Sequence, residues 1–112
     1  MTDAYSRACA VTDEHSLPVL EAAHIKPFTK DGPHEVTNGI LLRSDLHRLF
    51  DRGYVSVTPE LKLVVSADLR HHFQNGHSYY PLAGKTVGHR TREADRPNGE
   101  LLRWHYENVF RK

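Results

Sequence analysis

Two short apolar segments separated by a loop rich in proline and glycine constrain this chain more than any other feature. In LPVLEAAHI (residues 17–25), alternation places Glu21, Ala23 and Ile25 on one face of a strand and His24 on the other. The next fourteen or so residues, KPFTKDGPHEVTNG (26–39), have the composition of a loop. ILL (40–42) follows and predicts a second short strand. The sequence therefore predicts a pair of strands joined by a long loop.

A short helix and a hairpin are predicted next along the chain. Ser44 is a suitable N-cap for a helix over residues 45–51, whose first turn carries Asp45, and Gly53 suits the helix exit. YVSV (54–57) and LKLVV (61–65) alternate on either side of TPE, which predicts a β-hairpin.

The remainder of the chain is predicted to be mainly helical. Ser66 is a candidate cap and Gly76 a candidate stop for one helix, and residues 84–99 have the composition of a polar linker. GELLRWHYENVF (99–110) predicts an amphipathic helix. Its candidate core residues are Leu101, Leu102, Trp104, Val109 and Phe110. Strands, short helices and a hairpin in this order indicate the α+β class.

Composition limits the kinds of protein that the chain can be. With 112 residues it has the length of one domain, and its net charge of +1 does not by itself indicate a nucleic-acid-binding protein. Cys9 is the only cysteine, which excludes an internal disulfide and a CxxC zinc ribbon and suits a reducing compartment. Neither a membrane span nor a signal peptide is evident, so we expect a cytoplasmic protein that does not bind membranes.

Four polar residues of the predicted strand–loop–strand–helix unit could form a catalytic site. His47 and Asp51 are four residues apart and share a helix face, a spacing that can bind one divalent cation. If the helix packs across the strands, His24 and Asn38 approach the same cleft. A neutral imidazole beside a bound metal can take a proton from water, and this combination suits phosphodiester hydrolysis.

The run AHIKP … NGILL … DLHRLFDRGYVSV resembles the HNH endonucleases, which have the ββα-metal (His-Me finger) fold. The resemblance is dense over residues 9–58 and is strongest to bacterial restriction-type and modified-DNA-dependent nucleases. It implies one HNH domain over residues 1–112, with a core motif at about 18–58, an added hairpin and a C-terminal helical extension at about 66–112. By position, His24 matches the general base, Asn38 the asparagine that braces the loop and orients the base, and His47 the metal ligand on the helix.

One position departs from the wider family pattern. Many HNH enzymes carry Asp or His immediately before the base, as a metal ligand, and this chain has Ala23 there. Glu21 lies on the same strand face, so we hypothesise that it completes the metal site directly or through water. Asp51 is where some HNH enzymes place a further ligand. A site with few protein ligands suits Mg²⁺ or Mn²⁺, with Zn²⁺ or Ni²⁺ as alternatives.

The resemblance implies an enzyme that hydrolyses DNA, most simply double-stranded DNA, by restriction-type cleavage or nicking. Two copies acting as a homodimer could cut both strands. The predicted phosphate-binding residues flank the proposed site and are Lys26, Lys30, Arg43, Arg48 and Arg52.

Two other functions fit the same residues. Because Ala23 removes a ligand, the chain could be a non-catalytic nucleic-acid-binding module on the HNH fold. It could also be a small structural domain whose histidines bind zinc for stability.

Overall fold

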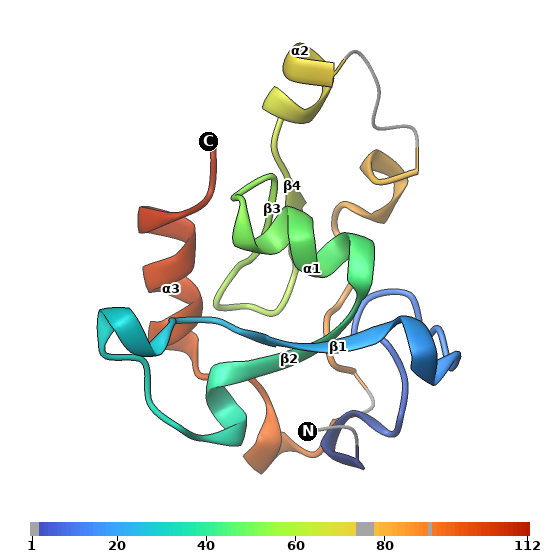
Figure 1. Cartoon of the computed structure of the whole chain (residues 1–112), viewed down its shortest axis with the longest axis vertical. Coiled ribbons are helices and arrows are strands. Elements are labelled where there is room, and N and C mark those ends of the chain that lie inside the picture. The colour runs from blue at the N-terminus through green and yellow to red at the C-terminus, as the bar shows by residue number, and fades with distance from the viewer. Residues whose placement is uncertain (1–2, 74–77, 90) are drawn as a thin grey trace.

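A β-hairpin-like pair of strands covered by a short helix forms the centre of the computed structural model, which describes residues 3–73, 78–89 and 91–112 (Figure 1). Strand β1 (Leu20–His24) pairs antiparallel with β2 (Gly39–Arg43), so that His24 lies opposite Gly39. Helix α1 (Ser44–Asp51) follows β2 directly and packs against both strands. The two predicted strands and the helix are confirmed. Arg43 rather than Ser44 occupies the N-cap position.

Alternation along β1 explains how α1 is held. Ala23 and Ile25 are buried, whereas Ala22 and His24 are exposed, as the period of two predicts. Leu46 and Phe50 of α1 are buried four residues apart and therefore lie on one helix face. The polar positions of the same helix, including His47 and Asp51, are left outside this core.

The predicted hairpin is also confirmed. Strand β3 (Val55–Val57) pairs antiparallel with β4 (Leu63–Val65). Helix α2 (Asp68–Phe73) follows, and its predicted stop at Gly76 lies outside the described residues. Helix α3 (Gly99–Asn108) packs against β3. Short 3₁₀ helices complete the structure: η1 (Asp3–Tyr5), η2 (Leu17–Val19), η3 (Phe28–Lys30), η4 (Val36–Asn38), η5 (Tyr80–Leu82) and η6 (Glu93–Asp95).

Residues 84–99 are not the polar linker that their composition predicts. Val87 is fully buried in the core, and its N–H donates to the Leu61 carbonyl. The N–H of the neighbouring Gly88 donates to the carbonyl of Ala10, at 3.0 Å. Asn98 then caps α3 by accepting hydrogen bonds from two backbone N–H groups. A few buried contacts therefore fix a segment that is polar on average.

The apolar face of α3 differs in detail from the sequence prediction. Leu102 is fully buried, but the other candidates on this helix and just after it are only half-buried. A buried histidine, His105, takes a central place instead. Its ring stacks on Phe50 of α1, with centroids 3.7 Å apart and planes 9° from parallel.

Both ring nitrogens of His105 have a partner. Because the Phe50 carbonyl can only accept, Nε2 carries the hydrogen and donates to it at 2.8 Å. Nδ1 then accepts from the hydroxyl of Ser56, at 2.7 Å. A neutral imidazole satisfies this arrangement fully, and burial lowers the pKa of His105 to about 4. His105 therefore ties the end of α1 to β3 and α3.

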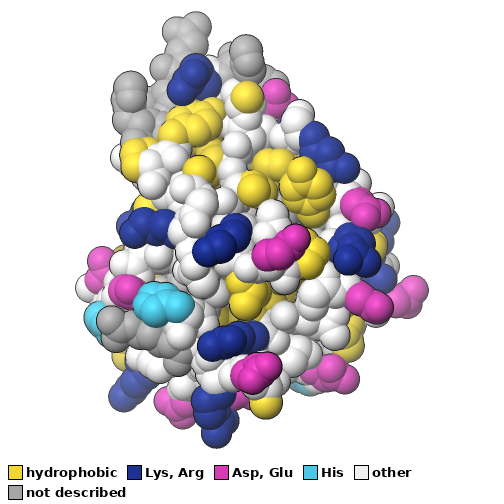
Figure 2. Space-filling model, turned by 180° about the vertical axis from the view of Figure 1, so that it is seen from behind, with side chains coloured by type: hydrophobic (Ala, Val, Ile, Leu, Met, Phe, Trp, Pro, Cys, Tyr) yellow, Lys and Arg dark blue, Asp and Glu magenta, His cyan; other side chains and the backbone are white. Residues whose placement is uncertain are grey.

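Figure 2 shows the face opposite to the one in Figure 1. Basic and acidic side chains are interspersed over this face, without an extended patch of one sign. This agrees with the net charge of +1. Within the described ranges, no helix combines the length and the apolar character that crossing a membrane requires.

Acid should destabilise the fold through His105. The His105 imidazole has a pKa near 6.5 in the unfolded chain and a pKa of about 4 in the folded chain. Stability contributed by the neutral ring is therefore complete above about pH 6.5 and declines as the pH falls towards 4, by up to about 3 kcal/mol. Urea unfolding at pH 7 and pH 4 should show a larger loss for the wild type than for His105→Gln, which cannot titrate. An exposed-site variant, His15→Gln, should behave like the wild type, and equal losses for all three would contradict the assignment.

Candidate active site

His47 lies between two carboxylates on the exposed side of α1. Its Nδ1 is 2.8 Å from Oε1 of Glu21 on β1, and its Nε2 is 3.1 Å from Oδ2 of Asp51, one helical turn later. The strand and the helix thus bring together three residues that the sequence predicted as a metal site.

The presence of a carboxylate beside each ring nitrogen of His47 favours the binding of a cation. A neutral imidazole has one N–H, so it can donate to only one of the two oxygens, and its other nitrogen then turns a lone pair towards the second. A second proton or a cation relieves this repulsion. When the Nδ1–H group donates a hydrogen bond to Glu21, the Nε2 lone pair and the Asp51 carboxylate remain as two ligands for one divalent ion.

This donor set is small. Among the described residues, no group of three or more His, Cys, Asp or Glu side chains is arranged so that all could hold one ion. A two-donor site suits a cation that keeps several waters and gains ligands from substrate phosphate, as Mg²⁺ does. The residues therefore fit a weakly held hard cation better than a structural zinc ion, which needs four ligands.

Electrostatics connect His24 to this group. Partial burial raises the pKa of the Asp51 carboxyl, and the nearby Glu21 charge raises it further. The charges of His47 and His24 oppose this shift. His24 is therefore close enough to interact with Asp51, although it comes from the end of β1. Its side chain is exposed and open to solvent water.

Asn38 is fully buried and binds only backbone groups. Its side-chain oxygen accepts from the Lys26 N–H, and its amide nitrogen donates to the carbonyls of Lys26 and Pro33, each at 2.9 Å. The Asn38 carbonyl also accepts from the N–H of Ile25, beside His24. The structure places Asn38 as a brace for the strand end and loop, and its side chain does not enter the group around His47.

Loss of this brace should destabilise the chain. Asn38→Ala removes three hydrogen bonds of about 0.5–1.5 kcal/mol each, so the free energy of unfolding should fall by about 2–4 kcal/mol. Asn38→Asp should cost at least as much at neutral pH, because a carboxylate would face two carbonyl oxygens. Urea unfolding measures both. The neighbouring Thr37→Ala should stay within about 0.5 kcal/mol of the wild type, and an equal effect of both positions would contradict the role of Asn38.

The predicted phosphate-binding residues differ in availability. Lys30, Arg48 and Arg52 are exposed, and the Lys26 ammonium lies 5.3 Å from the centre of the Trp104 ring. Arg43 instead makes a bidentate pair with Asp45, at 2.7 and 3.0 Å. The Asp45 carboxylate also accepts from the Tyr79 hydroxyl. This pairing raises the pKa of Arg43 and compensates its charge, which weakens it as a phosphate ligand.

Two residues beside His24 were missed by the sequence argument. The rings of Phe28 and His34 stack, and Phe28 also contacts the ring of His24. Neither spacing nor periodicity indicates this cluster, because its members come from a strand end and two parts of a loop. The one available signal was a phenylalanine in an otherwise polar loop.

A known family model matches the part of the chain that carries the proposed site. Residues 9–58 match the family model described as HNH endonuclease. This stretch contains all five proposed catalytic and metal-binding residues: Glu21, His24, Asn38, His47 and Asp51. The resemblance recognised from the sequence is therefore confirmed over residues 9–58. The match supports a nuclease role for this stretch, which is called the HNH segment below.

A solved structure resembles the fold well beyond the HNH segment. It is described as "Modification dependent TagI restriction endonuclease", and it superposes with a TM-score of 0.67 at 22% sequence identity. The similarity covers 96% of this chain but 35% of that one, so the chain spans about a third of the solved protein. At this identity the likeness shows the fold, and it confirms the α+β architecture with an HNH core. The comparison with curated proteins found no match.

Proposed function

We propose that the chain is a divalent-metal-dependent DNA endonuclease that hydrolyses phosphodiester bonds. The observation that carries this proposal is the group formed by His47, Glu21 and Asp51, with His24 in electrostatic reach on the adjoining strand. The group lies within the HNH segment. A base and a cation-binding pair on a rigid strand and helix are the components that hydrolysis of a phosphodiester needs.

His24 is the proposed general base. Its imidazole is exposed, so a water molecule can reach it and lose a proton to it as the water oxygen attacks phosphorus. Asn38 acts through the backbone, because its hydrogen bonds to Lys26 and Pro33 fix the chain that follows His24. Asn38 is therefore a positioning residue.

His47 and Asp51 are the proposed cation ligands. Nε2 of His47 and a carboxylate oxygen of Asp51 would hold the ion, and Glu21 would orient the ring through Nδ1. A divalent ion bound there would stabilise the negative charge that develops on the phosphate and on the leaving oxygen. Mg²⁺ or Mn²⁺ suits this small ligand set best, because such an ion would keep several waters and gain oxygen ligands from the substrate phosphate.

DNA is the proposed substrate, since the similar solved structure is described as a restriction endonuclease and the HNH match is to endonucleases. Exposed Lys30, Arg48 and Arg52 would contact phosphates, and such contacts fix position without reading sequence. One site cuts one strand, so a single copy would nick the duplex and a pair of copies would be needed to cut both strands together.

Removal of the base should separate cleavage from binding. His24→Ala should lower the rate of metal-dependent plasmid nicking by about a hundredfold or more, because the alanine side chain cannot accept a proton. The same variant should still fold and still bind DNA. Nicking is measured in the presence of Mg²⁺ or Mn²⁺, and the addition of EDTA should abolish it.

His15→Ala is the matched control, because His15 is an exposed histidine upstream of β1. It should cut at the wild-type rate. Wild-type cleavage by His24→Ala would disprove the assignment of the base. Binding without cleavage by the wild type in every metal would favour the non-catalytic module, and a melting temperature lowered by chelation, without cleavage, would favour the zinc-stabilised domain.

Glu21 should control metal affinity. Glu21→Ala removes the partner of His47 Nδ1, and loss of such a partner typically weakens metal binding by about 10–100-fold. The Mn²⁺ concentration that gives half-maximal nicking should rise accordingly, whereas Glu21→Gln, which retains an oxygen acceptor, should have a smaller effect. The exposed Glu60→Ala serves as the control. An unchanged Mn²⁺ requirement in Glu21→Ala would remove Glu21 from the site.

A further inference from the structure

An exposed aromatic ring stands beside the proposed base. Phe28 begins η3, and its side chain is 51% exposed. The centre of its ring is 5.0 Å from that of His24 and 5.2 Å from that of His34, and the His34 ring is stacked on it with 22° between the planes. A ring this exposed adds little to the core, yet the two imidazoles restrict its movement.

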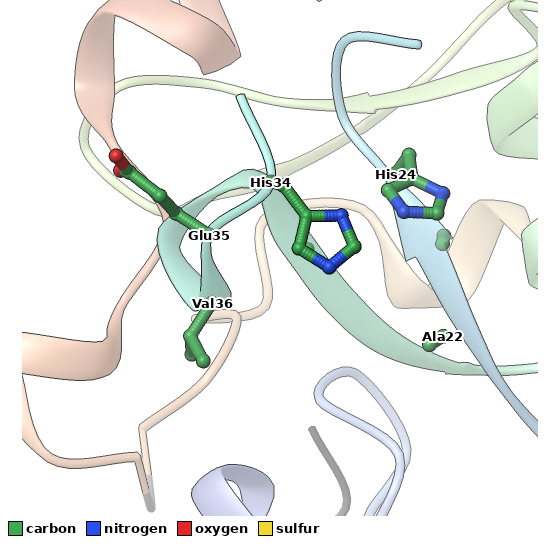
Figure 3. Close-up of a pocket in the computed structure, with 7 residues that line it drawn as sticks. Ala22, His24, His34, Glu35 and Val36 are labelled. Carbon is green, nitrogen blue, oxygen red and sulfur yellow. The ribbon is translucent and has the colours of Figure 1, made fainter. Parts of the chain in front are cut away.

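A pocket of about 300 Å³ is lined by His24 and His34, the two residues whose rings Phe28 contacts, although Phe28 itself does not line it. Its walls are largely apolar and include Ala22, Val36 and Gly39, and Figure 3 shows the imidazoles of His24 and His34 beside one another at its edge. The Glu35 side chain is turned away from them. The pocket is at the small end of the range for ligand sites, about 300–1,000 Å³, so it suits one small flat group.

Gly39 explains why space exists here. It lies directly opposite His24 in the strand pair, and with no side chain at that position the surface beside the imidazole stays open. Its backbone is ordinary extended strand, with φ −139° and ψ 153°, so the conformation does not demand glycine. The glycine therefore matters here for the space that it leaves beside His24.

We infer that Phe28, His34 and this pocket form a subsite for an unpaired nucleobase of the DNA strand being cut. The inference rests on the proposed function, which puts a phosphate next to His24. The base attached to that nucleotide is the nearest flat aromatic group that the substrate offers. Aromatic side chains stack on any base, and unpaired bases are bound in this way. Lys30 is the last residue of η3 and Lys26 lies two residues before it, so both would supply positive charge for the adjoining DNA backbone.

Binding in EDTA tests the subsite without any cleavage. The probes are a fluorescent single-stranded oligonucleotide and an abasic oligonucleotide of the same length, which carries the same phosphates without bases. The wild type should bind the base-containing strand about five- to hundredfold more tightly. Phe28→Ala should bind both strands equally, with an unchanged salt dependence, because the phosphate contacts remain. Phe28→Tyr should retain the preference.

Leu17→Ala is the matched control, since Leu17 is another exposed large apolar residue, 43% exposed, and lies in η2, before β1. It should keep the wild-type preference. Equal binding of the two strands by the wild type, or a preference that persists in Phe28→Ala, would overturn the subsite. If the preference depends on Phe28 but no metal supports nicking, the proposed endonuclease fails and the base-binding site stands. If the protein nicks DNA but binds the base-containing and abasic strands equally, the proposed endonuclease stands and the base-binding subsite fails.

Discussion

The brace made by the Asn38 side chain is the interaction on which the rest of the site depends. Between β1 and β2 the chain passes through a loop that contains two 3₁₀ helices but no strand or α-helix, so the loop has few regular backbone hydrogen bonds of its own. Asn38 replaces them with bonds to both backbone groups of Lys26 and to the Pro33 carbonyl. These bonds hold the end of β1, where His24 projects, and hold the start of the loop that carries Phe28. A single buried amide thus fixes both the strand end that carries His24 and the loop that follows it.

The central unit could be predicted because its signals are local. Alternation around Ala23 and Ile25 indicated β1, and the spacing of His47 and Asp51 on a short helix indicated a shared face. The hairpin was evident from alternation on both sides of TPE. In each of these cases neighbouring residues decide the structure, so the sequence carries the information in a window of a few residues. Glu21 was identified in the same way, from its strand face.

Other features depend on residues far apart in the chain and left no such pattern. The Ser56–His105 bond joins residues on a strand and a distant helix, and nothing in either segment indicates the other. Likewise, the sequence did not indicate that Tyr79, from beyond the hairpin, donates to the Asp45 carboxylate that pairs with Arg43. The segment 84–99 was misread because its average polarity conceals the buried Val87. Composition describes a segment's mean, whereas burial is decided residue by residue.

The hydrogen bond between His105 and the Phe50 carbonyl has a consequence for how the HNH segment could be fused to another protein. It fastens the end of α1 to α3, and farther on the Arg111 N–H donates to the carbonyl of Gly53. A side chain at Gly53 would collide with the Val109 carbonyl, so the two segments approach as closely as backbones can. The family match ends at residue 58, whereas the contacts that hold α1 in place reach as far as Arg111. A fusion protein that contained residues 9–58 alone would therefore carry the proposed ligands without the segments that pack against their helix.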